Sequence, residues 1–178
     1  EALLKFAETA SVRTEQASLM TKLGTKQRGW GHPAAHELVT AALRAHKQRH
    51  PGVFTIQLDV KNAFGEIFRS KAMRGLNKAA PMTARIAAAQ WGPKQTRYII
   101  AGDPDQQVYF TDRGMWQGSA ISQPAFCQAM VDALNEAGEP VQSVEAQEDG
   151  SLVVAYADDV LIQDNDLNRL QTRTEKVI

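Results

Sequence analysis

The stretch LVVAYADDVLI (residues 152–162) sets two adjacent aspartates inside an otherwise apolar run. The residues on both sides of Asp158 and Asp159 are typical of β-strands, so the pattern predicts two strands joined by a tight turn. Neighbouring carboxylates repel each other and raise each other's proton affinity, a penalty that a divalent cation would reverse. A polar turn is the alternative interpretation, because turns favour Asp. The apolar residues on both flanks favour the metal site.

A third aspartate, Asp59, follows a short apolar run that predicts a buried strand over residues 53–58. Asn62 can cap a helix that begins near Ala63. A charge at the end of a buried strand is costly unless it is paired, and a divalent cation is the best partner for a carboxylate without an obvious basic mate. An aspartate that only shapes a turn or caps a helix is the alternative interpretation.

The segment RGMWQGSAISQPAF (residues 113–126) combines a glycine-containing loop with the start of a helix expected over residues 122–137. Gly118 would let the backbone approach a ligand closely. Gln117 carries both a hydrogen-bond donor and an acceptor. By itself the segment is equally compatible with an ordinary loop before a capped helix.

The remaining pattern mixes helices and strands without regular alternation. We expect helices over residues 2–22, 34–49 and 81–91 and from about residue 166, with Pro33 in a first helical position. Further strands are expected over residues 96–101, 107–111, 141–146, 151–157 and 160–163. This order predicts an α+β fold in which helices pack on one face of a sheet.

The composition is that of an ordinary globular domain, with 178 residues of which 43% are hydrophobic. The single cysteine excludes an internal disulfide framework and suggests an intracellular setting. No apolar run approaches the roughly 20 residues that a membrane span needs. Although the net charge is zero, Lys and Arg outnumber Asp and Glu by 16 to 6 over residues 1–100 and are outnumbered 4 to 14 over residues 101–178. The basic half is compatible with a nucleic-acid partner, and equally with solvated faces that pair with each other.

Taken together, the three segments resemble the catalytic motifs of reverse transcriptases in order and spacing. Asp59 with the aromatic Phe64 five positions later is similar to the first motif. Gln117-Gly118 and the SQPAF sequence at residues 122–126 resemble the second, and the YADD sequence at residues 156–159 resembles the third. The QRGW sequence at residues 27–30 is similar to a glutamine–glycine–aromatic segment of the non-LTR retrotransposon and group II intron enzymes, where Phe is commoner than Trp30.

This resemblance implies a polymerase palm, an antiparallel sheet with helices packed on one face, over residues 53–178. Residues 1–52 would form a helical part of the fingers, with the thumb absent. Asp59 and Asp158 would bridge two Mg²⁺ ions, with Mn²⁺ as a possible substitute, and the Val60 carbonyl would be a further ligand. Asp159 would complete the charge of the site or orient it. Two such metals can serve both ends of an in-line displacement.

The same resemblance implies an RNA-directed DNA polymerase that adds dNTPs to a primer 3′-hydroxyl. Phe64 would pack under the incoming sugar and exclude a 2′-hydroxyl, while Gln117 and Gly118 would contact the nucleotide. Backbone amides around Asn62 and Ala63 would meet the triphosphate at a helix N-terminus. The expected partners are an RNA template and a DNA primer, with Lys26 and Arg28 touching the template backbone.

The origin implied is a retrotransposon, which would place a eukaryotic example in the nucleus. Because the chain starts and stops within helical patterns, we expect a piece of a longer polypeptide that is inactive, or nearly so, when isolated. Two other interpretations stay open. One is the palm of an RNA-dependent RNA polymerase, which Phe64 disfavours, and the other is a non-catalytic relic that only binds nucleic acid or a partner.

Overall fold

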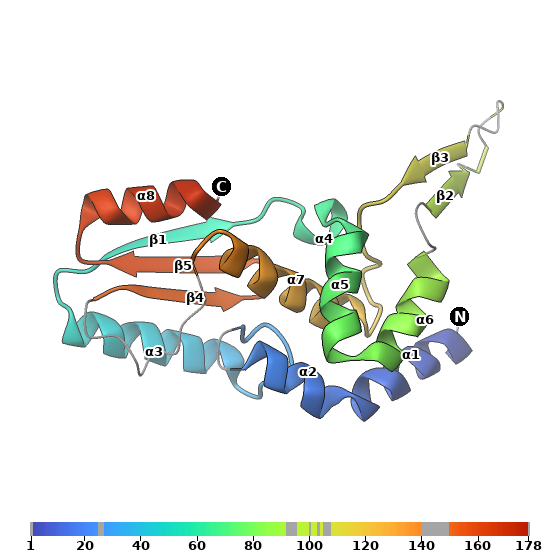
Figure 1. The fold of residues 1–178 in the computed structure, drawn as a ribbon, viewed down its shortest axis with the longest axis horizontal. Helices are drawn as coiled ribbons and strands as arrows, with labels where there is room; N and C mark the ends of the chain where they lie inside the picture. The colour runs from blue at the N-terminus through green and yellow to red at the C-terminus, as the bar shows by residue number, and fades with distance from the viewer. Residues whose placement is uncertain are drawn as a thin grey trace. The chain divides into compact units, whose positions relative to one another are not determined.

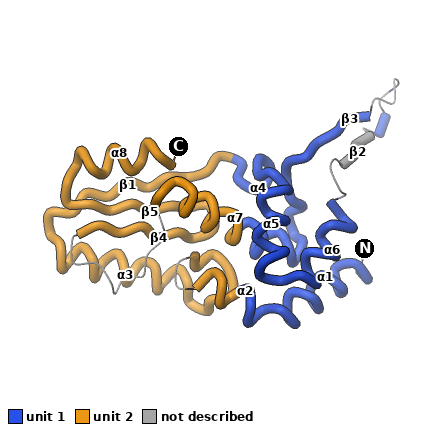
Figure 2. The backbone as a smooth tube through the Cα atoms, viewed as in Figure 1, with its two compact units in different colours: residues 1–19, 62–126 blue, residues 20–61, 127–178 orange. Residues whose placement is uncertain are grey.

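The computed structural model describes residues 2–24, 27–91, 96–99, 101, 102, 104, 108–139 and 150–177. The chain divides into two compact units, shown in different colours in Figure 2. Unit 1 comprises residues 1–19 and 62–126, and unit 2 comprises residues 20–61 and 127–178. Each unit therefore draws on two separate stretches of sequence.

Unit 2 contains a three-stranded antiparallel sheet of order β1-β5-β4 (Figure 1). Strand β1 is Phe54–Asp59, β4 is Leu152–Tyr156 and β5 is Asp159–Asp164. The predicted pair of strands around the two adjacent aspartates is thus confirmed, and β1 pairs with β5 along its whole length. The strand expected over residues 141–146 lies outside the described residues.

The core of unit 2 lies on one face of this sheet. Alternation along the strands turns Ile56, Leu58, Val160 and Ile162 to the same side, where they pack with Leu134 of α7 (Ser122–Glu136) and with α8 (Leu167–Val177). On the other side, α3 (Ala35–Arg49) covers β4 through Val39 and Leu43, which pack against Leu152, Val154 and Tyr156. The side chains of β1 that point to this second side are exposed.

Unit 1 is mainly helical. It contains α1 (Ala2–Thr14), the first part of α2 (Gln16–Leu23), α4 (Ala63–Glu66), α5 (Arg69–Ala79), α6 (Pro81–Trp91) and the start of α7. The strands expected over residues 96–101 and 107–111 are β2 (Thr96–Ile99) and β3 (Val108–Thr111), which pair antiparallel. None of the helices in the part of the chain that the structure describes has the length and hydropathy needed to cross a membrane. The α+β prediction, with an antiparallel sheet, is confirmed.

Three local expectations need correction. The helix predicted over residues 2–22 is two helices with a break at Glu15, and the 34–49 helix starts at Ala35 rather than at Pro33. The helix that starts at Ala63 has only four residues. Asn62 occupies its N-cap position with a φ of 52°, yet its side chain makes no cap hydrogen bond.

The early end of α4 has a tertiary cause. The Ile67 carbonyl accepts a hydrogen bond from the Gly114 amide at 2.9 Å, and Phe68 forms a β-bridge with Arg113. These contacts hold the chain extended at Ile67, where ψ is 132°, so the helix cannot continue.

Candidate functional site

The three predicted acidic residues gather at one end of the sheet in unit 2. Asp59, the last residue of β1, is the direct register partner of Asp159, the first residue of β5. Asp158 immediately precedes Asp159, in the turn that joins β4 to β5. The fold therefore brings Asp59 together with a pair of acids that lies far away along the chain.

The pleat of the sheet decides which way these side chains point. Because Leu58 and Val160 face the core, the side chains next to them along their strands, Asp59 and Asp159, share the opposite face. On that face the Gln57 side-chain amide donates a hydrogen bond to Asp159 Oδ1 at 3.0 Å. Gln57, which no sequence motif singled out, thus holds one carboxylate oxygen of the cluster.

The donor set suits a hard divalent cation. Like charges directly opposite each other across a strand pair are destabilising, and carboxylate oxygens are the ligands that Mg²⁺ prefers. Among the described residues, no group of three or more His, Cys, Asp or Glu side chains is arranged as a ready metal site. Mg²⁺ usually takes one or two protein carboxylates and completes its shell with water and substrate phosphates.

The single cysteine is influenced by the charge of this cluster. Cys127 of α7 is fully buried and packs with Leu23, Val131 and Trp30, as expected for a core residue. Burial, together with the negative charge of Asp158, raises the pKa of the Cys127 thiol to about 12. The thiol is therefore neutral at physiological pH.

In unit 1, the loop that carries Gln117 and Gly118 is anchored on both sides. Before it, the Met115 amide donates to the Phe64 carbonyl at 2.8 Å, and the buried Arg69 Nε donates to the Gly114 carbonyl at 2.7 Å. After it, Ser122 Oγ donates to the Trp116 carbonyl at 2.9 Å. The two predicted substrate-binding residues lie between these anchors and are exposed.

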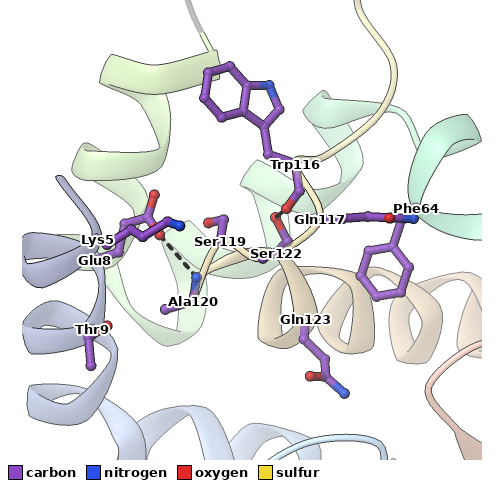
Figure 3. Close-up of a pocket in the computed structure, with 11 residues that line it drawn as sticks. Lys5, Glu8, Thr9, Phe64, Trp116, Gln117, Ser119, Ala120, Ser122 and Gln123 are labelled. Atoms are coloured by element: carbon purple, nitrogen blue, oxygen red, sulfur yellow. Dashed lines mark hydrogen bonds between the residues drawn. The ribbon is translucent and has the colours of Figure 1, made fainter. Parts of the chain in front are cut away.

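A pocket of about 470 Å³ opens beside this loop (Figure 3). One wall of the pocket is formed by α1, where the buried Glu8 carboxylate accepts a hydrogen bond from the Ala120 amide at 3.0 Å. Gly118 has a φ of 86°, which favours glycine, and no described atom lies within 4 Å of where a Cβ would be. The lining residues are Lys5, Glu8, Thr9, Phe64, Trp116, Gln117, Gly118, Ser119, Ala120, Ser122 and Gln123.

Phe64 is half-buried, and its ring forms part of the pocket wall. It stacks on the ring of Phe126 with centroids 4.8 Å apart and planes 28° apart. Phe126 is itself buried in α7. Phe64 therefore has one ring face supported by Phe126.

The other predicted contacts have simpler surroundings. Ala63 is buried, and the Gly65 and Glu66 amides donate to the Asn62 carbonyl. Val60 is 38% exposed. Arg28 is half-buried, and its amide donates to the Ala155 carbonyl at 3.1 Å. Lys26 lies outside the described residues.

Besides Gln57, sequence reasoning missed two further kinds of residue. The first is Gln27, which binds the turn of the acidic hairpin through its side chain; its place in the QRGW sequence was the available signal. The second is the α1 wall of the pocket, Lys5, Glu8 and Thr9. These residues have no motif, because their contribution depends only on tertiary packing.

Comparisons with known proteins show the family and the fold of this chain. The sequence profile described as "Reverse transcriptase (RNA-dependent DNA polymerase)" matches residues 5–178. Among solved structures, an apo telomerase from Candida tropicalis, truncated from its C-terminal domain, is similar with a TM-score of 0.63 at 13% sequence identity. The similarity covers 96% of this chain and 36% of the telomerase chain, and at this identity it shows the fold alone. The comparison with curated proteins gave no match. Because the profile spans almost all of its length, the chain belongs to the reverse transcriptase (RNA-dependent DNA polymerase) family.

Proposed function

We propose that this domain is the catalytic palm of an RNA-directed DNA polymerase that adds dNTPs to a primer 3′-hydroxyl on an RNA template. The observation that carries the proposal is the register of the sheet, which sets Asp59 opposite Asp159 with Asp158 next to them. In the proposed assignment residues 53–178 form the palm and residues 1–52 belong to the fingers. A non-LTR retrotransposon is the proposed origin, and a nuclear location would follow for a eukaryotic element.

Reverse transcriptases generally use divalent metal ions. In the proposed site Asp59 and Asp158 hold two Mg²⁺ ions with help from the Val60 carbonyl. When bound, the ions would lower the proton affinity of the primer hydroxyl and neutralise the charge of the leaving pyrophosphate. Asp159 accepts a hydrogen bond from the Gln57 side chain. We assign to Asp159 the supporting role of completing the negative charge of the site.

The remaining residues would select and place the nucleotide. Phe64 would lie under the sugar with its ring supported by Phe126. Gln117 and Gly118 lie exposed on an anchored loop, within reach of a ligand. The amides of Asn62 and Ala63 would meet the triphosphate. Because α4 has only four residues, its dipole adds less to that contact than a full helix would.

Metal titration of the chain tests the proposal directly. Mn²⁺ binding, followed by electron paramagnetic resonance of the free ion, should weaken at least about tenfold in Asp59→Asn, because a charged ligand is lost. Asp166→Asn is the matched control. Asp166 follows the opposite end of β5, and an asparagine can still accept the capping bonds from the Asn168 and Arg169 amides.

Unchanged Mn²⁺ affinity in Asp59→Asn would show that the site assignment is wrong. Primer extension by the full polypeptide that carries this domain supplies the second test, and it should require Asp59 and Asp158. The isolated chain should show little or no synthesis. Robust synthesis by it would overturn that expectation.

A further inference from the structure

One side chain from a distant segment holds the turn of the acidic hairpin. Gln27 is fully buried, and its Nε2 donates a hydrogen bond to the Ala157 carbonyl at 2.9 Å. Its Oε1 accepts a hydrogen bond from the Ala157 amide at 2.7 Å. Both backbone polar groups of the residue between Tyr156 and Asp158 are thus bound by the same amide group.

The backbone conformation of this turn has to be stabilised by contacts from other segments of the chain. Ala157 has a φ of 52°, in the left-handed region. For a residue other than glycine, a sparsely populated conformation of this kind carries a conformational strain of about 1–3 kcal/mol. Such a conformation persists only where contacts with the surrounding structure hold it in place. The two hydrogen bonds from Gln27 fix the peptide groups on both sides of the Ala157 Cα, and so oppose relaxation of the turn.

Gln27 is itself held in place by its own segment. Its Oε1 accepts a second hydrogen bond from the Gly29 amide at 2.8 Å. The backbone of Gln27 forms a parallel bridge with Ala155, and the Arg28 amide donates to the Ala155 carbonyl. The amide group therefore has little freedom to rotate, which makes it a rigid support.

Gly29 makes the approach of this segment possible. A methyl group on Gly29 would collide with the backbone nitrogen and Cα of Ala157. The spacing of glutamine and glycine in the QRGW sequence thus has a physical reason: the glutamine supplies the hydrogen bonds, and the glycine leaves space for the turn.

We propose that Gln27 is a positioning residue for the metal-binding acids. By fixing both peptide groups of Ala157, it sets the directions in which the Asp158 and Asp159 side chains leave the turn. It touches neither substrate nor reacting atoms and acts only through the backbone. The inference rests on the proposed function, since it assumes that these carboxylates bind a divalent cation. Groups that orient metal ligands typically contribute about 10–100-fold to metal affinity.

The test compares Gln27, which binds the turn between β4 and β5, with Gln163, a buried glutamine within β5. In Gln27→Met the volume is nearly kept while both hydrogen bonds to Ala157 are lost. Mn²⁺ affinity of the chain should fall at least about tenfold. Gln163→Met is the matched control, because Gln163 is buried in β5 and its amide donates to Thr55 Oγ1 at 3.0 Å, at the end of the sheet away from the acids. Its Mn²⁺ affinity should stay within about twofold of the wild type, since additivity holds for distant sites.

Folding is controlled in two ways. Urea unfolding establishes that each variant is folded at the titration temperature. If Gln27→Met does not fold, the comparison is made between Ala157→Gly and the double variant Gln27→Met/Ala157→Gly, because glycine adopts a positive φ without strain. In the wild-type chain, the Ala157 amide and the Gln27 side-chain amide protons should exchange with solvent at least about a hundredfold more slowly than exposed amides.

The outcomes separate the two proposals. If Asp59→Asn leaves Mn²⁺ affinity unchanged, the metal site itself is wrong, and the role of Gln27 falls with it. If Asp59→Asn weakens binding while folded Gln27→Met binds like the wild type, the positioning role alone is overturned. Exchange of the Ala157 amide at the rate of an exposed amide would overturn it as well, without any variant.

Discussion

Phe64 is the residue on which the choice of sugar is proposed to depend. Its ring lines the pocket and stacks on Phe126. In the full polypeptide, Phe64→Val should raise the ratio of ribonucleotide to deoxynucleotide kcat/KM by about 10–100-fold, because the clash with a 2′-hydroxyl is relieved. Primer extension with each nucleotide class measures this ratio.

Phe68→Val is the control for that experiment. Phe68 follows on the same segment, is 42% exposed and lies under the Arg113 guanidinium rather than against the pocket. Its replacement should leave the ratio unchanged. A wild-type preference for ribonucleotides would replace the DNA polymerase proposal with the RNA-dependent RNA polymerase alternative.

Asp164 is a buried carboxylate that takes part in an ion-pair network at the other end of β5. Arg169 donates to its carboxylate at 2.7 Å and Arg173 at 3.0 Å, while Arg173 also pairs with Glu139 at 2.8 Å. Burial alone would raise the pKa of Asp164, but the hydrogen bonds from Arg169, the Asp166 amide and Arg173 outweigh it and lower the pKa.

A pH-dependent contribution to stability follows from this direction. Since the pKa is lower in the folded than in the unfolded chain, the contribution is fully present above about pH 4 and is lost as pH falls through the folded pKa. Asp164→Asn should lower the free energy of unfolding by about 3 kcal/mol at neutral pH. Urea unfolding at a series of pH values should show the difference from wild type shrinking in acid, and a constant difference would contradict this account.

Among the helices, α6 has an N-terminus capped from another element. The Glu15 carboxylate accepts hydrogen bonds from the Met82 amide at 3.0 Å and the Thr83 amide at 2.8 Å. Burial opposes ionisation of Glu15, yet these bonds lower its pKa overall. Glu15→Ala should destabilise the chain by about 1 kcal/mol, as the loss of a cap does. Glu15→Gln keeps a hydrogen-bond acceptor and should reduce the free energy of unfolding by less than Glu15→Ala does. Equal reductions for the two variants in urea unfolding would argue against a capping role.

The sequence predicted elements well wherever local pattern decides them. The hairpin around Asp158 follows from the apolar residues on both of its flanks, α6 follows from Pro81, and α7 follows from the run after Ser122. Prediction from the sequence failed where contacts with distant segments determine the ends of an element. Glu15, at the break between α1 and α2, is bound to α6, and α4 stops where Ile67 pairs with Gly114. No local pattern contains such information.

For the whole molecule, the gathering of Asp59 with Asp158 and Asp159 depends on the pairing of β1 with β5. Hydrophobic pattern identifies both strands but does not state that they are neighbours, so resemblance to the family supplied that step. The sequence also could not show that the acids belong to unit 2 while Phe64 and Gln117 belong to unit 1.

The division into two units predicts which part of the chain is stabilised by metal binding. Because all three acids belong to unit 2, Mg²⁺ should slow amide hydrogen exchange in β1, β4 and β5 through linkage between binding and local opening. Helices α5 and α6 of unit 1 should change little. The test is to measure amide hydrogen exchange by mass spectrometry in the presence of Mg²⁺ and in the presence of a chelator. The Asp59→Asn substitution should abolish the difference between the two conditions. Equal slowing throughout the chain would contradict a site confined to those acids.

The burial of Cys127 has a practical consequence for labelling. With the pKa raised to about 12 by burial, the thiol is almost wholly protonated at neutral pH, and only the thiolate reacts with maleimides or aromatic disulfides. The chain's one cysteine should therefore react with Ellman's reagent slowly in the native state and fully in urea. An engineered surface cysteine could then carry a fluorophore or spin label without first removing the natural one.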